Sequence, residues 1–226
     1  MTNIFISILL TSIFASCLNN ENQPRADTLV FKNQEKNMDL DMDFLDAYKL
    51  TLGKTFLYGN YENFINDIGI PSKVTITKTE FAINSKADLE KVVATAKDPN
   101  IVTLHYPWID MWYGYDNYII PSTIDFRKTD KGVTYGETTF NKAYTIEQFK
   151  KQFPKSANPT FKLPQSLFEI ATKEKGANFE HYMLMRKSKD DPSATPMIEF
   201  TFDNGKLIFI LFANFWREKL LPTAAL

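Results

Sequence analysis

Two periodicities of apolar and polar residues alternate along this chain from about residue 39 onwards. Runs in which the two kinds of side chain alternate are typical of β-strands with one buried face. Such runs predict strands over Lys73–Lys78, Ile101–Trp108, Trp112–Ile120, Ser122–Lys128, Val133–Phe140, His181–Lys187, Met197–Phe202 and Lys206–Phe212. The last two form the clearest pair, because Asp203-Asn204-Gly205 between them is typical of a hairpin turn.

Other segments carry apolar residues three and four positions apart, which favours helices. Helices are predicted between Asp39 and Gly53, over Tyr61–Ile68, over Ser85–Lys97, between Thr145 and Pro154, and over Leu167–Lys175. The fourth has the clearest start signal, because Thr145 and Gln148 form a capping box.

Strands grouped as hairpins with helices between them predict an α+β fold. We expect an antiparallel sheet built of hairpins, with several short helices packed on it. Tyr61-Glu62-Asn63-Phe64 before Pro71 and Ile146-Glu147-Gln148-Phe149 before Pro154 are each a short helix ending at proline. This echo suggests two similar halves, residues 39–140 and 141–226. Proline is also common after helices in general, so the echo does not require a duplication.

The first residues have the pattern of a targeting segment. The apolar run Ile4–Phe14 is too short, at about 1.5 Å per helical residue, to cross a hydrocarbon core of about 30 Å, so residues 1–16 are interpreted as a signal peptide. Phe14-Ala15-Ser16-Cys17 resembles the lipobox of bacterial lipoproteins, although the family prefers an aliphatic residue at Phe14 and basic residues before the apolar run. The alternatives are an uncleaved anchor and a soluble secreted form.

The resemblance to lipoproteins implies that Cys17 is acylated and becomes the first residue of the mature chain. The lipid bilayer is then one partner, and the location is the cell envelope. Leu18 stands where an Asp retains enterobacterial lipoproteins in the inner membrane, so the resemblance favours the outer membrane. Residues 17–38 are expected to form the lipidated tether and residues 39–226 a single globular domain.

Composition narrows the function classes. The chain has 26 basic and 27 acidic side chains, a net charge of −1 and few arginines, which argues against nucleic acid as a partner. Apolar residues make up 44% of the sequence, enough for a substantial core, and the one cysteine leaves no disulfide within the chain.

A search for catalytic and metal-binding patterns yields little. The sequence contains neither a Gly-x-Ser-x-Gly elbow nor a glycine-rich phosphate loop, and His105 and His181 lack ligand partners at metal-binding spacing. No cofactor and no metal are therefore expected. His105 has two open interpretations: it converges with Asp110 or Asp116, or it is a sheet histidine bonded to the backbone.

Aromatic residues gather between Tyr106 and Tyr118. Aromatic residues favour strands and fill sheet cores, so core packing is one interpretation of this segment. Two others stay open: a binding surface that engages another envelope protein, because Trp and Tyr give large, rigid contact areas, and a small-ligand pocket. The candidate surface residues are Trp108, Asp110, Trp112, Tyr113, Tyr115 and Tyr118.

Three segments of the body carry a second resemblance: Gly69-Ile70-Pro71, Trp112-Tyr113-Gly114-Tyr115 and Ile124-Asp125-Phe126. The order of helix, proline and aromatic strands resembles small outer-membrane assembly lipoproteins and β-lactamase-inhibitor proteins. The function expected is therefore a non-enzymatic, membrane-anchored binding or assembly protein, or an immunity lipoprotein that neutralises a toxin. The alternative is a glycosidase-like envelope hydrolase in which carboxylates such as Asp110, Asp116 and Glu137 converge in the fold.

Overall fold

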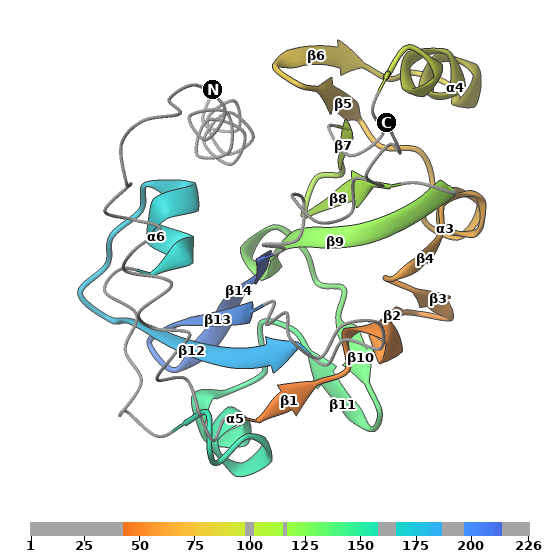
Figure 1. Ribbon diagram of the computed structural model, residues 1–226. Coiled ribbons are helices and arrows are strands. Elements are labelled where there is room, and N and C mark those ends of the chain that lie inside the picture. The colour runs from red at the N-terminus through yellow and green to blue at the C-terminus, as the bar shows by residue number, and fades with distance from the viewer. Residues whose placement is uncertain (1–42, 98–101, 115–116, 158–165, 187–196, 214–226) are drawn as a thin grey trace, which may run out of the picture.

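Most strands of the protein join one large sheet, whose order is β1-β12-β13-β14-β9-β8-β7-β5-β6, with β4 also paired to β9 (Figure 1). The computed structural model describes residues 43–97, 102–114, 117–157, 166–186 and 197–213. Within them, neighbouring strands of this sheet are antiparallel, except that β1 runs parallel to β12. The strands are β1 (Phe44–Leu45), β4 (Gly59–Asn60), β5 (Lys73–Ile76), β6 (Thr79–Ala82), β7 (Val102–His105), β8 (Ile109–Tyr113), β9 (Tyr118–Asp125), β12 (Phe179–Arg186), β13 (Met197–Asp203) and β14 (Lys206–Ala213).

A smaller antiparallel sheet has the order β11-β10-β2-β3. Its strands are β2 (Thr51–Leu52), β3 (Thr55–Phe56), β10 (Val133–Tyr135) and β11 (Thr138–Phe140). Hairpins thus account for most of both sheets, and the predicted α+β class with antiparallel sheets is confirmed.

Short helices connect the strands, and capping residues define where they begin. The α-helices are α3 (Tyr61–Ile68), α4 (Lys86–Ala94), α5 (Ile146–Gln152) and α6 (Leu167–Thr172), and the 3-10 helices are η1 (Ala47–Lys49) and η4 (Phe126–Lys128). The capping box of Thr145 and Gln148 is formed, and Asn60, Ser85 and Ser166 cap the other α-helices. Four of the predicted helices are therefore confirmed in position, although α4 and α6 end earlier than expected.

The predicted hairpin at the C-terminal end of the sheet is also confirmed. Met197 to Phe212 forms β13 and β14, with Asn204 and Gly205 both at positive φ in the turn. The strands predicted over Ile101–Trp108 and Ser122–Lys128 end earlier, at His105 and at Asp125, and Phe126–Lys128 form the 3-10 helix η4 instead.

Two more strand predictions are wrong inside the predicted range. In place of the Trp112–Ile120 strand, β8 ends at Tyr113 and β9 begins at Tyr118, directly after Asn117, whose φ is 59°. The Val133–Phe140 segment is a hairpin that turns at Gly136, whose φ is also 59°. Positive φ stops a strand, which explains both errors.

The helix predicted between Asp39 and Gly53 is wrong in its described part. These residues form β1, η1 and β2 instead. Burial explains the difference, because Leu45, Ala47, Leu50 and Leu52 are the buried residues, whereas Phe44, one of those spaced for a helix, is 56% exposed. Pairing with β12 and β10 satisfies the backbone of this segment, so tertiary contacts override the helical spacing.

Strands β12, β13 and β14 are covered on both faces, with α5 on one side and α6 on the other (Figure 1). The main core lies on the α5 side, where Phe149 packs on Phe200 and Phe202. A smaller cluster lies on the other side, where Phe168 of α6 packs on Phe209 and Phe179. None of the described helices is long and apolar enough to cross a membrane.

The predicted halves, residues 39–140 and 141–226, share the large sheet, because β9 pairs with β14 and β1 with β12.

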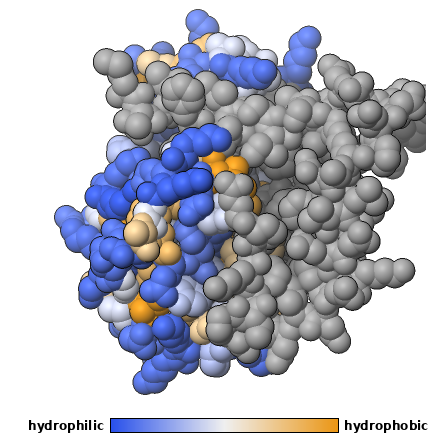
Figure 2. Space-filling view, turned by 90° about the vertical axis from the view of Figure 1, so that its left-hand side faces the viewer, coloured by the Kyte–Doolittle hydropathy of each residue, from blue (hydrophilic) through white to orange (hydrophobic). Residues whose placement is uncertain are grey.

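The face of the protein shown in Figure 2 is largely hydrophilic where the structure describes it, with small apolar spots. The signal peptide, Cys17 and the tether of residues 17–38 lie outside the described residues.

Candidate functional site

A row of polar side chains crosses the large sheet on the face opposite the main core. Lys73 pairs with His105, His105 with Asp110, and Asp110 with Thr123, so the four residues lie side by side on β5, β7, β8 and β9. Residues directly opposite each other in paired strands point to the same face. The alternate positions, such as Val74, Leu104 and Met111, face the core and are fully buried. The strand pattern therefore places polar groups on one face and apolar groups on the other.

The same line of paired residues continues across β14 and β13, beneath helix α6, with the apolar Leu211 between two polar residues. Thr123 pairs with Leu211 of β14, and Leu211 pairs with Glu199 of β13. Helix α6 covers this end of the face through Phe168, which packs on Phe209 at a ring distance of 5.1 Å. Phe209 also borders the pocket described below, so α6 lies at the edge of that pocket.

His105 is held by hydrogen bonds on both ring nitrogens. Its Nδ1 lies 2.8 Å from Asp110 Oδ1, and its Nε2 lies 2.8 Å from Thr75 Oγ1. The convergence of His105 with Asp110, one of the two interpretations from the sequence, is confirmed. These two hydrogen bonds fix the orientation of the imidazole ring.

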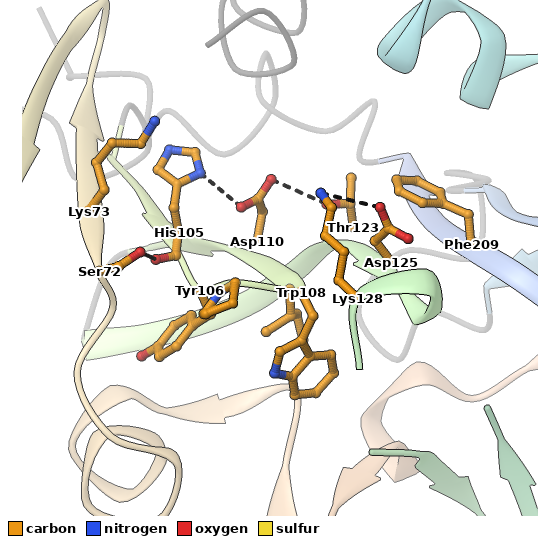
Figure 3. A pocket seen from close by; sticks show the side chains of 12 residues that line it. Ser72, Lys73, His105, Tyr106, Trp108, Asp110, Thr123, Asp125, Lys128 and Phe209 are labelled. Atoms are coloured by element: carbon orange, nitrogen blue, oxygen red, sulfur yellow. Dashed lines mark hydrogen bonds and ion pairs between the residues drawn. The ribbon is translucent and has the colours of Figure 1, made fainter. Parts of the chain in front are cut away.

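A pocket of about 120 Å³ opens around these groups. Figure 3 shows the side chains of Lys73, His105 and Asp110 on one side of the sheet, with the rings of Tyr106 and Trp108 on the other side. The pocket is lined by Ser72, Lys73, His105, Tyr106, Pro107, Trp108, Ile109, Asp110, Thr123, Asp125, Lys128 and Phe209.

An ion cluster forms the end of the pocket nearest to α6. Asp125 accepts hydrogen bonds from the Nε and Nη2 atoms of Arg127, each at 2.8 Å, and its Oδ2 lies 3.3 Å from Lys128 Nζ. Arg127 also binds Glu174 at 2.6 Å, just beyond the end of α6. Burial acts to raise the pKa of Asp125, but the hydrogen bonds and charges of Arg127 and Lys128 outweigh it and hold the pKa below its ordinary value.

This lowered pKa predicts a pH-dependent effect for Asp125→Asn. The carboxylate stabilises the fold above its unfolded pKa of about 3.9, and that contribution is lost as the pH falls through the lower folded value. We expect the variant to lose about 1–2 kcal/mol at neutral pH, because Arg127 is partly exposed and screened, and the difference from the parent to shrink in acid.

Urea unfolding between pH 2.5 and 7 measures this effect. Asp130→Asn is the matched control, because Asp130 is 86% exposed in its pair with Lys142 and should shift stability by no more than about 0.5 kcal/mol. A difference between Asp125→Asn and the parent that does not change with pH would contradict the assignment.

The structure separates the candidate surface residues. Trp108 is 8% exposed and Tyr113 is 9% exposed, so these two rings fill the core, as in the core-packing interpretation, and do not form a surface. Trp112 is partly buried, Tyr118 is 39% exposed, and Tyr115 lies outside the described residues. Of the predicted set, Asp110 and Trp108 line the pocket.

The carboxylates named for a hydrolase are not brought together where the structure describes them. Asp110 is on β8 of the large sheet, Glu137 is in the exposed β10–β11 turn of the small sheet, and Asp116 lies outside the described residues. The second carboxylate of the pocket is Asp125, whose lowered pKa keeps it ionised. A glycosidase needs one carboxyl group that stays protonated near neutral pH, and Asp125 does not meet that requirement.

Sequence reasoning missed Lys73 and Thr123, which join the site through strand pairing, and Lys128, which lies in η4 directly after β9. A lysine at the start of a strand and a threonine within one are too common to single out.

Within the described ranges, no group of three or more His, Cys, Asp or Glu side chains is placed to hold a metal ion. A comparison with protein-family models, curated proteins and solved structures found no match to this chain.

Proposed function

We propose that this chain is a membrane-anchored lipoprotein of the bacterial cell envelope whose body binds another protein without catalysis. The lipobox-like Phe14-Ala15-Ser16-Cys17 supports the anchor. The binding surface is the polar face of β5, β7, β8 and β9 around the pocket.

The observation that carries the binding function is the size and order of the pocket. Its volume of about 120 Å³ is below the roughly 300–1,000 Å³ of typical small-molecule sites, so it suits a single side chain of a partner. Its polar groups are already fixed, because His105 is bonded to Asp110 and Thr75, and Lys73 to Glu80. Groups that are fixed before binding lose little conformational entropy when a partner arrives.

The same geometry gives less support to the hydrolase alternative. Thr75, His105 and Asp110 form a hydroxyl–imidazole–carboxylate series with distances typical of a catalytic triad. Thr75 is only 4% exposed and does not line the pocket, so a substrate carbonyl entering the pocket does not reach its hydroxyl. The series therefore orients His105 and is not a nucleophile with its base.

Photo-crosslinking in intact cells tests the binding function. A photoreactive phenylalanine analogue at Ser72, which is exposed at the pocket, should give a discrete adduct with one envelope protein. The same group at Glu137, exposed in the β10–β11 turn, is the matched control and should give no discrete adduct. Equal adducts at both positions, or no adduct at Ser72, would contradict the proposal.

The proposal also covers the location of the anchor, the relation to other lipoproteins and an internal duplication. We place the anchor in the outer membrane on the strength of Leu18, and we retain the relation to assembly and immunity lipoproteins. An internal duplication is supported by α3 and α5, each of which ends shortly before a proline, Pro71 and Pro154.

A further inference from the structure

The charges around the pocket are unevenly neutralised, and this bears on what the pocket binds. Lys73 Nζ lies 2.8 Å from Glu80 Oε1, so the charge of this lysine is already paired. Lys128 is paired with Asp125 at 3.3 Å. Each lysine that lines the pocket therefore has a carboxylate partner from the protein itself.

The Asp125 cluster is neutral as a whole. It contains two carboxylates, Asp125 and Glu174, and two cations, Arg127 and Lys128, joined by ion pairs of 2.6 to 3.3 Å. An anion entering the pocket would have to compete with Asp125 or Glu80 for these cations. Displacing charged hydrogen bonds that are already formed costs about as much as the new bonds provide.

Asp110 is different from the other carboxylates of the pocket. Its Oδ1 lies 2.8 Å from His105 Nδ1 and its Oδ2 accepts from Thr123 Oγ1 at 3.3 Å. Across the part of the chain that the structure describes, no lysine or arginine forms an ion pair with it. Its side chain is 23% exposed. An ionised carboxylate can accept about four hydrogen bonds, so Asp110 can accept further hydrogen bonds from a group in the pocket.

Asp110 is thus the carboxylate of the pocket that no lysine or arginine of the described residues neutralises. We propose that the pocket receives a primary ammonium group, as on a lysine side chain of the partner, with Asp110 as the carboxylate that binds it. A compact ammonium fits a pocket of about 120 Å³ and can donate to Asp110 while its stem lies along the pocket wall. This inference rests on the proposed protein-binding function and specifies the chemistry of the partner.

The two histidines of the chain provide a direct readout. His105 lies in the pocket, whereas His181 lies under α6, where its Nδ1 is 3.0 Å from Ser166 Oγ. In the full-length protein in detergent micelles, with ¹³C-labelled histidine, each ring gives its own Cε1–H signal. The probes are three blocked peptides of the form Gly-X-Gly, with lysine, glutamine or glutamate as X, added at constant ionic strength.

We expect the lysine peptide to shift the His105 signal saturably and to leave the His181 signal in place. Asp110→Asn should weaken this binding at least about tenfold, because the amide still accepts a hydrogen bond from His105 but carries no charge. Glu137→Gln removes the same charge from an exposed turn outside the pocket and should bind like the parent. An unchanged His181 signal in Asp110→Asn shows that the fold is intact.

A shift of His105 by the glutamate peptide in place of the lysine peptide would overturn the inference, as would lysine binding that Asp110→Asn leaves unchanged. No shift with any peptide, together with a specific crosslink at Ser72, would overturn the charge assignment but retain the protein-binding function. Loss of both the crosslink and the shift would overturn the function itself.

Discussion

Replacing Glu199 with alanine is expected to lower the free energy of unfolding by about 3 kcal/mol, since it leaves buried hydrogen-bond donors without an acceptor. Glu199 is fully buried on β13. Its Oε2 accepts from the backbone N–H of Leu167 at 2.7 Å and its Oε1 from that of Phe168 at 3.2 Å. These are N–H groups of the first turn of α6, which have no partner within the helix.

Side chains complete the site around this carboxylate. Ser166, the N-cap of α6, donates its hydroxyl to Glu199 Oε1, and His181 Nδ1 lies 3.0 Å from the same oxygen. A buried charge is tolerated when it is fully hydrogen-bonded in this way, whereas a network with one member removed is strongly destabilised. Glu199 therefore fixes α6 on the sheet.

Urea unfolding gives the stability change, and hydrogen exchange of the Leu167 and Phe168 amides locates it. Glu199→Gln, which keeps the shape and one of the two acceptor oxygens, should show a smaller loss of protection at these amides than Glu199→Ala. Glu180→Ala on the neighbouring strand is the control, because Glu180 is exposed and should change stability by about 0.5 kcal/mol at most. Retained protection at Leu167 and Phe168 in Glu199→Ala would contradict this role.

The fixed position of α6 also matters for the pocket. Phe168 of α6 packs on Phe209, which lines the pocket, and the guanidinium of Arg127 lies 5.7 Å from the centre of the Phe168 ring. The ion cluster of Asp125 and the docking of α6 are thus joined through Phe168.

Local sequence signals predicted the parts of the fold that depend on neighbours in the chain. The Asn204-Gly205 turn and the capping box of Thr145 and Gln148 act within a few residues, so the sequence alone indicates them. The segment from Phe44 to Leu52 was mispredicted because its conformation depends on β10 and β12, which are distant in sequence. Helical spacing there carried no information about these partners.

The candidate site was predictable only in part, for the same reason. Asp110 and His105 are close in sequence and flank one hairpin, so their convergence was open to sequence reasoning. Lys73 and Thr123 join them through the strand order β5-β7-β8-β9, which no local pattern specifies. Glu199 had a usable signal, since an acidic residue within the apolar strand Met197–Asp203 requires buried partners.

The largest effect on the cellular behaviour of the protein is expected for Cys17→Ser, which should move the protein from the membrane fraction to the soluble fraction. The proposed acyl chains each contribute about 0.8 kcal/mol per buried methylene, and more than one chain is needed for stable anchoring. Serine at this position offers no thiol for acylation. The variant should also lose metabolic labelling with an alkyne analogue of palmitate.

Ser16→Ala is the matched control for the anchor, because it changes the adjacent residue while keeping a small side chain before Cys17. It should remain in the membrane fraction and retain the palmitate label. A Cys17→Ser protein that stays in the membrane fraction with unchanged mobility would show that the N-terminal apolar run anchors the chain without a lipid. The crosslink from Ser72 would still report on the pocket in that case, since the body and the anchor act independently in this proposal.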